Sequence, residues 1–582
     1  MTSTVQPPHR FSVWAPHARE RVDVVVDSTV HTMARDPDRT GWWLADLPAV
    51  RPDARYGFRL DGEETLLPDP RSRRQPDGPD GASQLVDHRA FRWTDHDWPG
   101  RPLPGAVLYE LHVGTFTPGR TFDAAAERLP HLLELGVTHV ELMPVCPFPG
   151  RHGWGYDGVA PWAVHEPYGG PEGLKRFVDT AHALGIGVVL DVVHNHLGPS
   201  GNYLPRFGPY FTDRHHTPWG AAINLDDHGS DEVRAYFLGS ALAWLRDYHL
   251  DGLRLDAVHA LADMRAKPFL EELAESVDRL AARIGRPLFL IAESDLNDPR
   301  TITSRESGGL GLAGQWSDDF HHALHAAFTG ESGSYYGDFA VAPLAAVAKT
   351  LTEGFFHNGT WSTVRGRHHG RPLDPARTPL HRLLGYTQTH DQIGNRAQGD
   401  RLSAALSPAQ LAGAAALVAV SPFTPMLFMG EEWGASTPWQ YFTDHQDPAL
   451  AQAVREGRRR EFATAPDVEV PDPQDPATVE RSTLRWDERE REPHASLLEW
   501  HRLLLRLRRE HASGPAEVVF DEDERWITVR RGRLQAALNL APQPRKVPAA
   551  PGHPLAAYPE PPARAEDSLL LPPHGVALLL TA

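Results

Sequence analysis

Between about residues 105 and 511, eight short apolar runs with the length of β-strands alternate with longer segments that have the period of amphipathic helices. This alternation is typical of parallel α/β folds, because a helix must carry the chain back before the next parallel strand begins. The runs cover residues 106–113, 137–143, 187–193, 252–256, 287–293, 314–318, 384–389 and 425–429. Eight such strands predict a closed TIM (β/α)8 barrel, with helices at 122–135, 171–184, 231–248, 268–284 and 497–509 around it.

Two regions rich in short β-like pieces flank this barrel. We predict an N-terminal β-sandwich of carbohydrate-binding-module type at 1–97, a catalytic barrel at 98–512 and a C-terminal β-sandwich at 513–582. An insertion at about 195–229, rich in Gly, Pro, Tyr and Trp, should form a loop subdomain over the barrel mouth. Trp42, Trp43 and Trp93 could form a sugar-stacking platform, but aromatic residues of a sandwich more often belong to its core.

The composition indicates which partners the chain can have. Its 58 Lys and Arg against 76 Asp and Glu give a net charge of −18, which disfavours nucleic acid and anionic membranes but accepts a neutral sugar. The single cysteine, Cys146, excludes an intrachain disulfide, and the first residues lack the apolar core of a signal peptide. The most apolar window, 411–429, is interrupted by Pro422 and Pro425. We therefore expect a cytoplasmic protein with no membrane span.

Polar residues stand at the ends of several predicted strands, where barrels of this type carry their active sites. Residues 251–259 read Asp-Gly-Leu-Arg-Leu-Asp-Ala-Val-His. Side chains two residues apart on a strand share a face, so Arg254 and Asp256 should touch. A neighbouring guanidinium lowers the pKa of a carboxyl and orients it, which makes Asp256 the candidate nucleophile. Considered alone, such a pair is more often a structural ion pair.

A second carboxyl, that of Glu293, follows the apolar residues 288–292 and should emerge from a hydrophobic wall. Its pKa should therefore be raised, as a general acid requires. An ionised nucleophile and a protonated acid are the two carboxyls that retaining glycosidases use, typically about 5 Å apart. Asp391, at the end of the seventh run, is a third carboxylate that could stabilise an oxocarbenium-like transition state.

His196 and His390 are candidates for binding sugar hydroxyls, and buried hydrogen-bonding histidines are the alternative. Asp191, His194 and His196 could instead hold a metal ion, but no matching ligand motif occurs elsewhere in the sequence. We predict no metal and no cofactor.

Four ordered segments resemble the signature regions of the alpha-amylase family of glycoside hydrolases: Asp-Val-Val-His-Asn-His at 191–196, Gly-Leu-Arg-Leu-Asp-Ala-Val-His at 252–259, Ile-Ala-Glu at 291–293 and Thr-His-Asp at 389–391. The resemblance implies that Asp256 is the nucleophile, Glu293 the acid/base and Asp391 the stabiliser. It also implies an aromatic platform at Tyr156, a structural role for Asp191, hydrogen-bonding roles for His196, Arg254 and His390, and a leaving-group contact at His259. Thr389 departs from the Asn that the family often has before the His-Asp pair.

Further segments, such as His-Asp-Gln-Ile-Gly-Asn-Arg at 390–396, resemble one subgroup of this family. The resemblance implies hydrolysis of the α-1,4 bond next to the terminal trehalose of an α-glucan, and pairing with a synthase that builds this trehalose end. Residues that follow the catalytic strands should recognise the trehalose, and the candidates are Trp219, His259, Ser294 and Asp295. The alternatives are a glycogen branching enzyme and, from another class, a catalytically silent glucan-binding protein.

Overall fold

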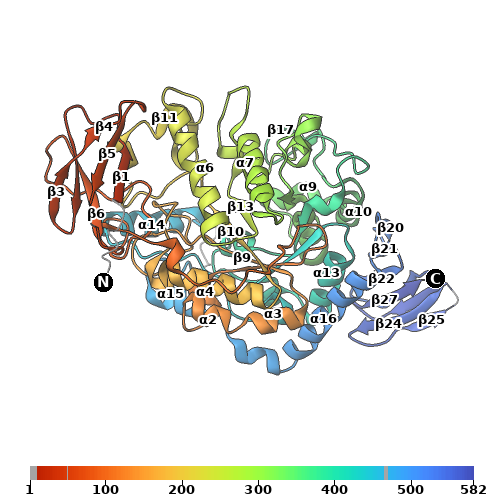
Figure 1. Ribbon diagram of the computed structural model, residues 1–582. Helices are drawn as coiled ribbons and strands as arrows, with labels where there is room; N and C mark the ends of the chain where they lie inside the picture. The colour runs from red at the N-terminus through yellow and green to blue at the C-terminus, as the bar shows by residue number, and fades with distance from the viewer. Residues whose placement is uncertain (1–8, 49, 464–468, 566, 582) are drawn as a thin grey trace.

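The computed structural model describes residues 9–48, 50–463, 469–565 and 567–581. Figure 1 shows a strand-rich N-terminal region on one side, a central barrel with surrounding helices, and a strand-rich C-terminal region on the other side. This arrangement confirms the predicted fold class, a TIM barrel with flanking β regions. None of the helices in the described ranges is both long enough and apolar enough to span a membrane.

The central barrel closes through eight strands that pair in parallel with their neighbours. All eight predicted runs supply one strand each, and the last strand pairs back to the first through Met426 and Leu108. In chain order the strands are β8 (Leu108–Leu111), β9 (His139–Leu142), β10 (Gly187–Val192), β13 (Gly252–Leu255), β14 (Phe289–Ala292), β15 (Gly314–Trp316), β18 (Leu383–Gly385) and β19 (Thr424–Phe428). Parallel closure brings the carboxyl ends of all eight strands to one rim.

Helices cover the outside of the barrel with their apolar faces, as expected for buried parallel strands. The main ones are α4 (Gly170–Ala183), α6 (Ser230–Asp247), α7 (Phe269–Ile284), α8 (Asp318–Thr329), α10 (Pro343–Glu353), α13 (Pro408–Val420) and α16 (His494–His511). The prediction of a single helix at 122–135 is wrong, because this segment forms two helices, α2 (Phe122–Ala126) and α3 (Leu129–Leu135). Pro130 lies in the first turn of α3 and has no N–H to continue the helix from α2.

The N-terminal region consists of a three-stranded and a four-stranded antiparallel sheet. Trp42 and Trp43 are 4% and 3% exposed, so they belong to its core, as the sequence favoured. The strands are β1 (His9–Trp14), β5 (Trp42–Leu47) and β4 (Ala34–Arg35) in one sheet, and β3 (Thr29–Thr32), β2 (Val22–Val26), β6 (Arg55–Leu60) and β7 (Ser83–Gln84) in the other.

The C-terminal region likewise contains two sheets, of five and three strands. The larger sheet contains β20 (Glu517–Asp521), β21 (Trp526–Arg531), β22 (Leu534–Asn539), β27 (Val576–Thr581) and β24 (Gly552–Tyr558). The smaller sheet contains β23 (Arg545–Pro548), β26 (Ser568–Leu571) and β25 (Ala563–Ala565). Side chains of α13 and α16 share one hydrophobic cluster with this region, so the barrel and the C-terminal sheets are packed together.

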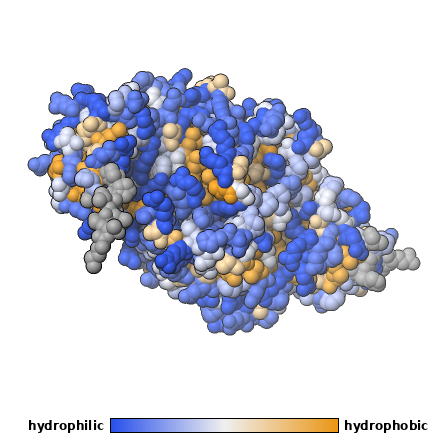
Figure 2. Space-filling model, in the orientation of Figure 1, coloured by the Kyte–Doolittle hydropathy of each residue, from blue (hydrophilic) through white to orange (hydrophobic). Residues whose placement is uncertain are grey.

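The insertion after β10 carries an antiparallel hairpin of β11 (Phe211–Thr217) and β12 (Gly220–Ile223). Figure 1 shows β11 between the N-terminal sheets and α6. The preceding residues contact the N-terminal region directly, since Tyr210 meets the ring of Trp14 edge-on at 5.3 Å. The face of the molecule in Figure 2 is largely hydrophilic, with hydrophobic residues in separate small areas.

Candidate active site

Arg254 lies at the centre of the group of polar side chains at the carboxyl ends of the barrel strands. It is fully buried, and its Nη1 donates to Asp191 Oδ2 and to Asp256 Oδ1, at 2.8 Å each. The same guanidinium places Nη2 3.7 Å from Glu293 Oε2. Asp191 and Arg254 are direct neighbours in the register of β10 and β13, and Asp256 lies two residues beyond Arg254 on the same face. The contact predicted between Arg254 and Asp256 is therefore present.

Asp256 accepts hydrogen bonds on both carboxyl oxygens. Arg254 donates to Oδ1, and Asn195 Nδ2 donates to Oδ2 at 2.7 Å and to the backbone carbonyl of Asp256 at 2.8 Å. Only 9% of Asp256 is exposed. Donors on both oxygens fix the direction of the carboxyl group, which is what a nucleophile needs.

Glu293 follows directly after β14 and meets the environment that the sequence predicts. Burial raises the pKa of Glu293 to about 8, Arg254 opposes this shift, and Asp256 and Asp391 add to it. The N–H of Ala257 donates to Glu293 Oε2, and Ala257 has φ 39°, a conformation that non-glycine residues rarely adopt. The turn after Asp256 thus holds the carboxyl of Glu293, and the carboxyl stays protonated near neutral pH.

The third carboxylate, Asp391, lies in the short helix α11 (His390–Gly394). Thr389 caps this helix: its hydroxyl accepts from Asp391 N–H at 3.2 Å, while the side chain of Gln392 accepts from Thr389 N–H at 2.8 Å. A hydroxyl at the position before the His-Asp pair therefore performs a capping role, which Asn could also perform. His390 Nε2 lies 3.4 Å from Asp391 Oδ1.

Tyr156 joins the groups around Arg254 to those around His390. Its hydroxyl donates to Asp191 Oδ2 at 2.6 Å and lies 2.8 Å from His390 Nε2. The rings of Tyr156 and His390 are stacked, with centroids 5.1 Å apart and an interplanar angle of 23°. Tyr156 thus presents an aromatic ring between Asp191 and His390, and its role as a platform under the sugar stays a prediction.

His196 and Trp219 form a second aromatic surface at the mouth. Their rings are stacked 4.7 Å apart at 8°, and His196 Nε2 lies 3.1 Å from the backbone carbonyl of Tyr156. Trp219 occupies the turn between β11 and β12 and is 50% exposed. The insertion therefore places an exposed indole against His196, and the role of Trp219 as a leaving-group contact stays a prediction.

The other predicted leaving-group residues lie in the loops after β13 and β14. His259 Nδ1 is 3.9 Å from Asp295 Oδ1, and the other oxygen of Asp295 accepts from Arg365 Nη2 at 2.8 Å. Ser294 is buried, and its hydroxyl accepts from Leu296 N–H at 3.3 Å. This contact favours a loop-holding role for Ser294, whereas His259 and Asp295 present polar groups at the partly exposed rim.

Several residues of the site were missed by the sequence reasoning. Glu110 on β8 contacts His390 through both carboxyl oxygens. Asp318, at the start of α8, accepts from Tyr386 hydroxyl at 2.7 Å, and burial raises the pKa of Asp318 to about 6. The available signal was a charged residue inside or just after an apolar strand, which is costly to bury without a function or a partner. Asn195 lies in the signature-like segment 191–196, but its contact with Asp256 was not predicted.

The alternative metal site is not assembled in the part of the chain that the structure describes. No group of three or more His, Cys, Asp or Glu side chains there is arranged to hold a metal ion. Asp191 is occupied by Arg254 and Tyr156, and His194 packs its ring 5.2 Å from Phe237.

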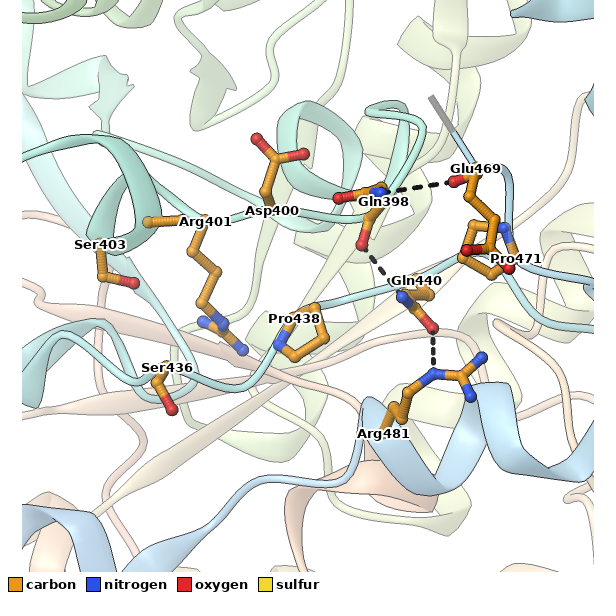
Figure 3. Close-up of a pocket in the computed structure, with 11 residues that line it drawn as sticks. Gln398, Asp400, Arg401, Ser403, Ser436, Pro438, Gln440, Glu469, Pro471 and Arg481 are labelled. Carbon is orange, nitrogen blue, oxygen red and sulfur yellow. Dashed lines mark hydrogen bonds between the residues drawn. The ribbon is translucent and has the colours of Figure 1, made fainter. Parts of the chain in front are cut away.

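A separate cavity of about 620 Å³ lies beside the segments at 398–404 and 436–440. Figure 3 shows Gln440 between the backbone of Gln398 and the side chain of Arg481 in this cavity. Trp154 contacts residues of both the cavity and the active site: its indole N–H donates to the Gln440 carbonyl at 3.0 Å, and its ring meets that of His390 edge-on at 5.8 Å. The three carboxylates are not among the residues that line the cavity.

Comparisons with known proteins agree with this geometry. The family model "Alpha amylase, catalytic domain" matches residues 120–208, and a domain of unknown function, DUF3459, matches residues 511–578. A crystal structure of an alpha-amylase-like protein from Salmonella typhimurium has a TM-score of 0.90 and 38% identity, covering 100% of this chain and 98% of its own. The fold and the site define a glycoside hydrolase of the alpha-amylase type.

The curated relatives indicate the family within this class of glycoside hydrolases. A malto-oligosyltrehalose trehalohydrolase from Arthrobacter ramosus is 55% identical, with 93% of this chain and 94% of the relative covered. A 1,4-alpha-glucan branching enzyme from Xanthomonas campestris is 33% identical, but only 55% of this chain and 49% of that enzyme are covered. The chain belongs to the malto-oligosyltrehalose trehalohydrolase family.

Proposed function

We propose that this protein hydrolyses the α-1,4-glucosidic bond next to the terminal trehalose of maltooligosyltrehalose, releasing trehalose and a maltooligosaccharide with retained configuration. The observation that carries the chemistry is the single guanidinium of Arg254 beside both Asp256 and Glu293. One carboxyl is held by two donors and the other is protonated by its burial. Two carboxyls that share one guanidinium suit the spacing of about 5 Å that double displacement needs.

In this mechanism Glu293 donates its proton to the glycosidic oxygen while Asp256 attacks the anomeric carbon. The leaving group departs as trehalose, and the bond between the sugar and Asp256 forms as the glycosidic bond breaks. Glu293, now ionised, then takes a proton from water, which displaces Asp256 and regenerates both carboxyls. Asp391 and the floor formed by Tyr156 face the positive charge that develops on the sugar ring.

Residues on the leaving-group side of the cleaved bond should determine which glucosidic bond is hydrolysed. Trp219, His259 and Asp295 offer a stacking surface and hydrogen-bonding groups there, and Ser294 supports the loop that carries Asp295. A site that hydrogen-bonds trehalose hydroxyls should reject a plain maltooligosaccharide, because its own polar groups would then lose partners. His196, Arg254 and His390 would bind the sugar or hold the carboxylates on the other side of the bond.

The remaining expectations extend this proposal to the whole chain. We infer three units with boundaries near residues 97 and 512, since the sheets on either side of the barrel lie within 9–84 and 517–581. An oligosaccharide is the partner that the named relatives support. The substrate further implies a synthase that makes its trehalose end, and such α-glucan chemistry fits a cytoplasmic enzyme with one buried, unpaired cysteine.

The test compares two oligosaccharides of equal length, one ending in trehalose and the other with a free reducing end. We expect trehalose as the first product of the trehalose-ended oligosaccharide and much slower cleavage of the other one. The reducing end of the freshly released maltooligosaccharide should be the α-anomer by NMR. Equal cleavage of both would refute the specificity. New α-1,6 branches on amylose would favour a branching enzyme, and binding without any cleavage would favour a silent glucan-binding protein.

A further inference from the structure

Glu110 is a buried carboxylate in the first barrel strand that the reaction described above does not use. It is 1% exposed, and it contacts His390 twice: Oε1 meets the ring Nδ1, and Oε2 accepts from the backbone N–H at 3.1 Å. Both contacts come from one residue 280 positions later in the chain. Such a two-point contact fixes both the backbone and the ring of His390 relative to β8.

The hydrogen bonds around His390 determine how many protons its ring carries. Tyr156 has one hydroxyl proton, and it donates this proton in a hydrogen bond to Asp191 Oδ2 at 2.6 Å. The same carboxyl oxygen also accepts from Arg254. The Tyr156 oxygen must then accept from His390 Nε2, 2.8 Å away, so this nitrogen carries a proton. Nδ1 faces the carboxylate of Glu110, an acceptor, so it carries a proton as well. The ring is therefore held as an imidazolium.

Several charged and titratable groups face the ring of His390, and their combined effect on its pKa agrees with a ring that carries two protons. Burial by itself lowers the pKa of His390, but Asp391 and then Glu110 outweigh burial and raise the pKa to about 9, with Arg254 opposing them. The groups are Glu110 and His112 at β8, Glu141 on β9, Tyr156, Asp191 on β10, Arg254 on β13 and Asp391 on α11.

We propose that Glu110 is a positioning residue of this active site, which orients His390 and keeps both of its ring nitrogens protonated. The cationic ring then lies 3.4 Å from Asp391, where it supports the negative charge of that carboxylate and presents a fixed donor to Tyr156. The inference rests on the proposed catalytic site, but it does not depend on which α-glucan the enzyme prefers.

Glu141 provides a matched control for Glu110. The two residues face each other in the register of β8 and β9, and both are 1% exposed. Neither carboxyl oxygen of Glu141 has a hydrogen-bond partner within the described ranges, and burial followed by the charge of Glu110 raises its pKa well above the usual value. A buried carboxyl with no donor beside it favours its neutral form, so replacing Glu141 by Gln should change the local charge far less than replacing Glu110 does.

The experiment records kcat/KM against pH for the native enzyme, Glu110→Gln and Glu141→Gln, on whichever α-1,4-glucan the native enzyme cleaves best. In the native enzyme Glu293 sets the alkaline limb near pH 8. Without the Glu110 charge, the imidazolium should be lost at lower pH, because the pKa of a histidine beside a carboxylate falls by about one to three units when that charge is removed. The alkaline limb follows whichever of Glu293 and His390 loses its proton first. We therefore expect the limb of Glu110→Gln to move down, by as much as about two pH units for the largest fall in the pKa of His390, and that of Glu141→Gln to stay.

Two further variants keep the proposal falsifiable if Glu110→Gln folds poorly. Glu110→Asp retains the charge, so its limb should lie closer to that of the native enzyme. In a His390→Gln background, Glu110→Gln should cause no additional shift, because the titrating ring is gone. A lower kcat with an unmoved alkaline limb in Glu110→Gln, or equal shifts in Glu110→Gln and Glu141→Gln, would overturn the proposal. The wild-type product analysis is separate, so a failure of trehalose specificity would not be mistaken for a failure of this inference.

Discussion

The two sides of the active site are built differently. The buried polar chain is formed by Glu110, His390, Tyr156, Asp191, Arg254 and Asp256. Three of its members, Glu110, Asp191 and Arg254, lie on barrel strands, and contacts of 2.6 to 2.8 Å join the chain along most of its length. The leaving-group rim, formed by Trp219, His259, Asp295 and Arg365, lies on loops and turns and on one short 3-10 helix, Val258–Ala260. Its His259–Asp295 pair is 3.9 Å apart, and Trp219 is half exposed.

This difference separates reaction chemistry from specificity. A buried charge that loses its partner is left without solvent, so each member of the buried polar chain constrains the others. A partly exposed pair on loops is worth at most about 1 kcal/mol, because water can replace either partner. The reaction should therefore depend steeply on the buried polar chain, whereas the preference for a leaving group should be adjustable at the rim.

The largest effect should come from the two reacting carboxyls. Asp256→Asn removes the nucleophile, and Glu293→Gln removes the proton donor, so each should lower kcat/KM by at least about 10³-fold, or about 4 kcal/mol of transition-state stabilisation. Steady-state kinetics on the trehalose-ended oligosaccharide would measure this, with thermal unfolding to show that the variants fold. Activity within tenfold of the native enzyme in either variant would mean that the carboxyls have been assigned wrongly.

The second effect concerns pH. Glu293 must be protonated to act as an acid, and its pKa is raised to about 8, so kcat/KM should be maintained up to that pH. Above it, activity should fall about tenfold for each pH unit as the acid ionises. The rim variant Asp295→Asn is the control, and its alkaline limb should coincide with that of the native enzyme. A limb near pH 5 in the native enzyme would contradict the raised pKa.

Much of the buried polar chain could be predicted from the sequence, because strand alternation and strand ends determine where side chains point. Arg254 and Asp256, two residues apart on one strand, illustrate this, and Glu293 after its apolar run does so as well. Glu110 could not be paired with His390 in advance, since 280 residues separate them and only barrel closure brings β8 beside β19 and α11.

The leaving-group rim was less predictable for a different reason. Trp219 and Asp295 follow predicted strands, but the loop conformation decides what they contact. Arg365 reaches Asp295 from the turn of a separate hairpin, β16 (Thr360–Ser362) and β17 (Arg367–His369), which was not predicted at all. The divided helix at Pro130 shows the same limit on a smaller scale.

The third effect lies on the rim and should change preference more than rate. Trp219→Ala removes the exposed indole that stacks on His196, and aromatic stacking of this kind contributes about 0.5 to 1.5 kcal/mol. We expect the ratio of kcat/KM for trehalose-ended against plain oligosaccharide to fall by roughly 2- to 10-fold. Trp361→Ala, which truncates another tryptophan that is 55% exposed, is the matched control and should leave the ratio unchanged. An equal fall in both variants would argue against a specific role for Trp219.

The smallest effect should come from Arg365, which acts on the rim only through Asp295. The side chains of Arg365 and Asp295 are 27% and 39% exposed, so their ion pair is partly screened by water and is worth at most about 1 kcal/mol. Arg365→Ala should therefore lower kcat/KM for the trehalose-ended substrate by no more than about 5-fold, and added salt should reproduce part of this loss in the native enzyme. Arg365→Lys keeps the charge but not the planar donor geometry, so its kcat/KM should lie between those of the native enzyme and Arg365→Ala. A loss of 100-fold or more in Arg365→Ala would show that the rim holds the reacting groups as tightly as the buried polar chain does, and the distinction between the two sides would then fail.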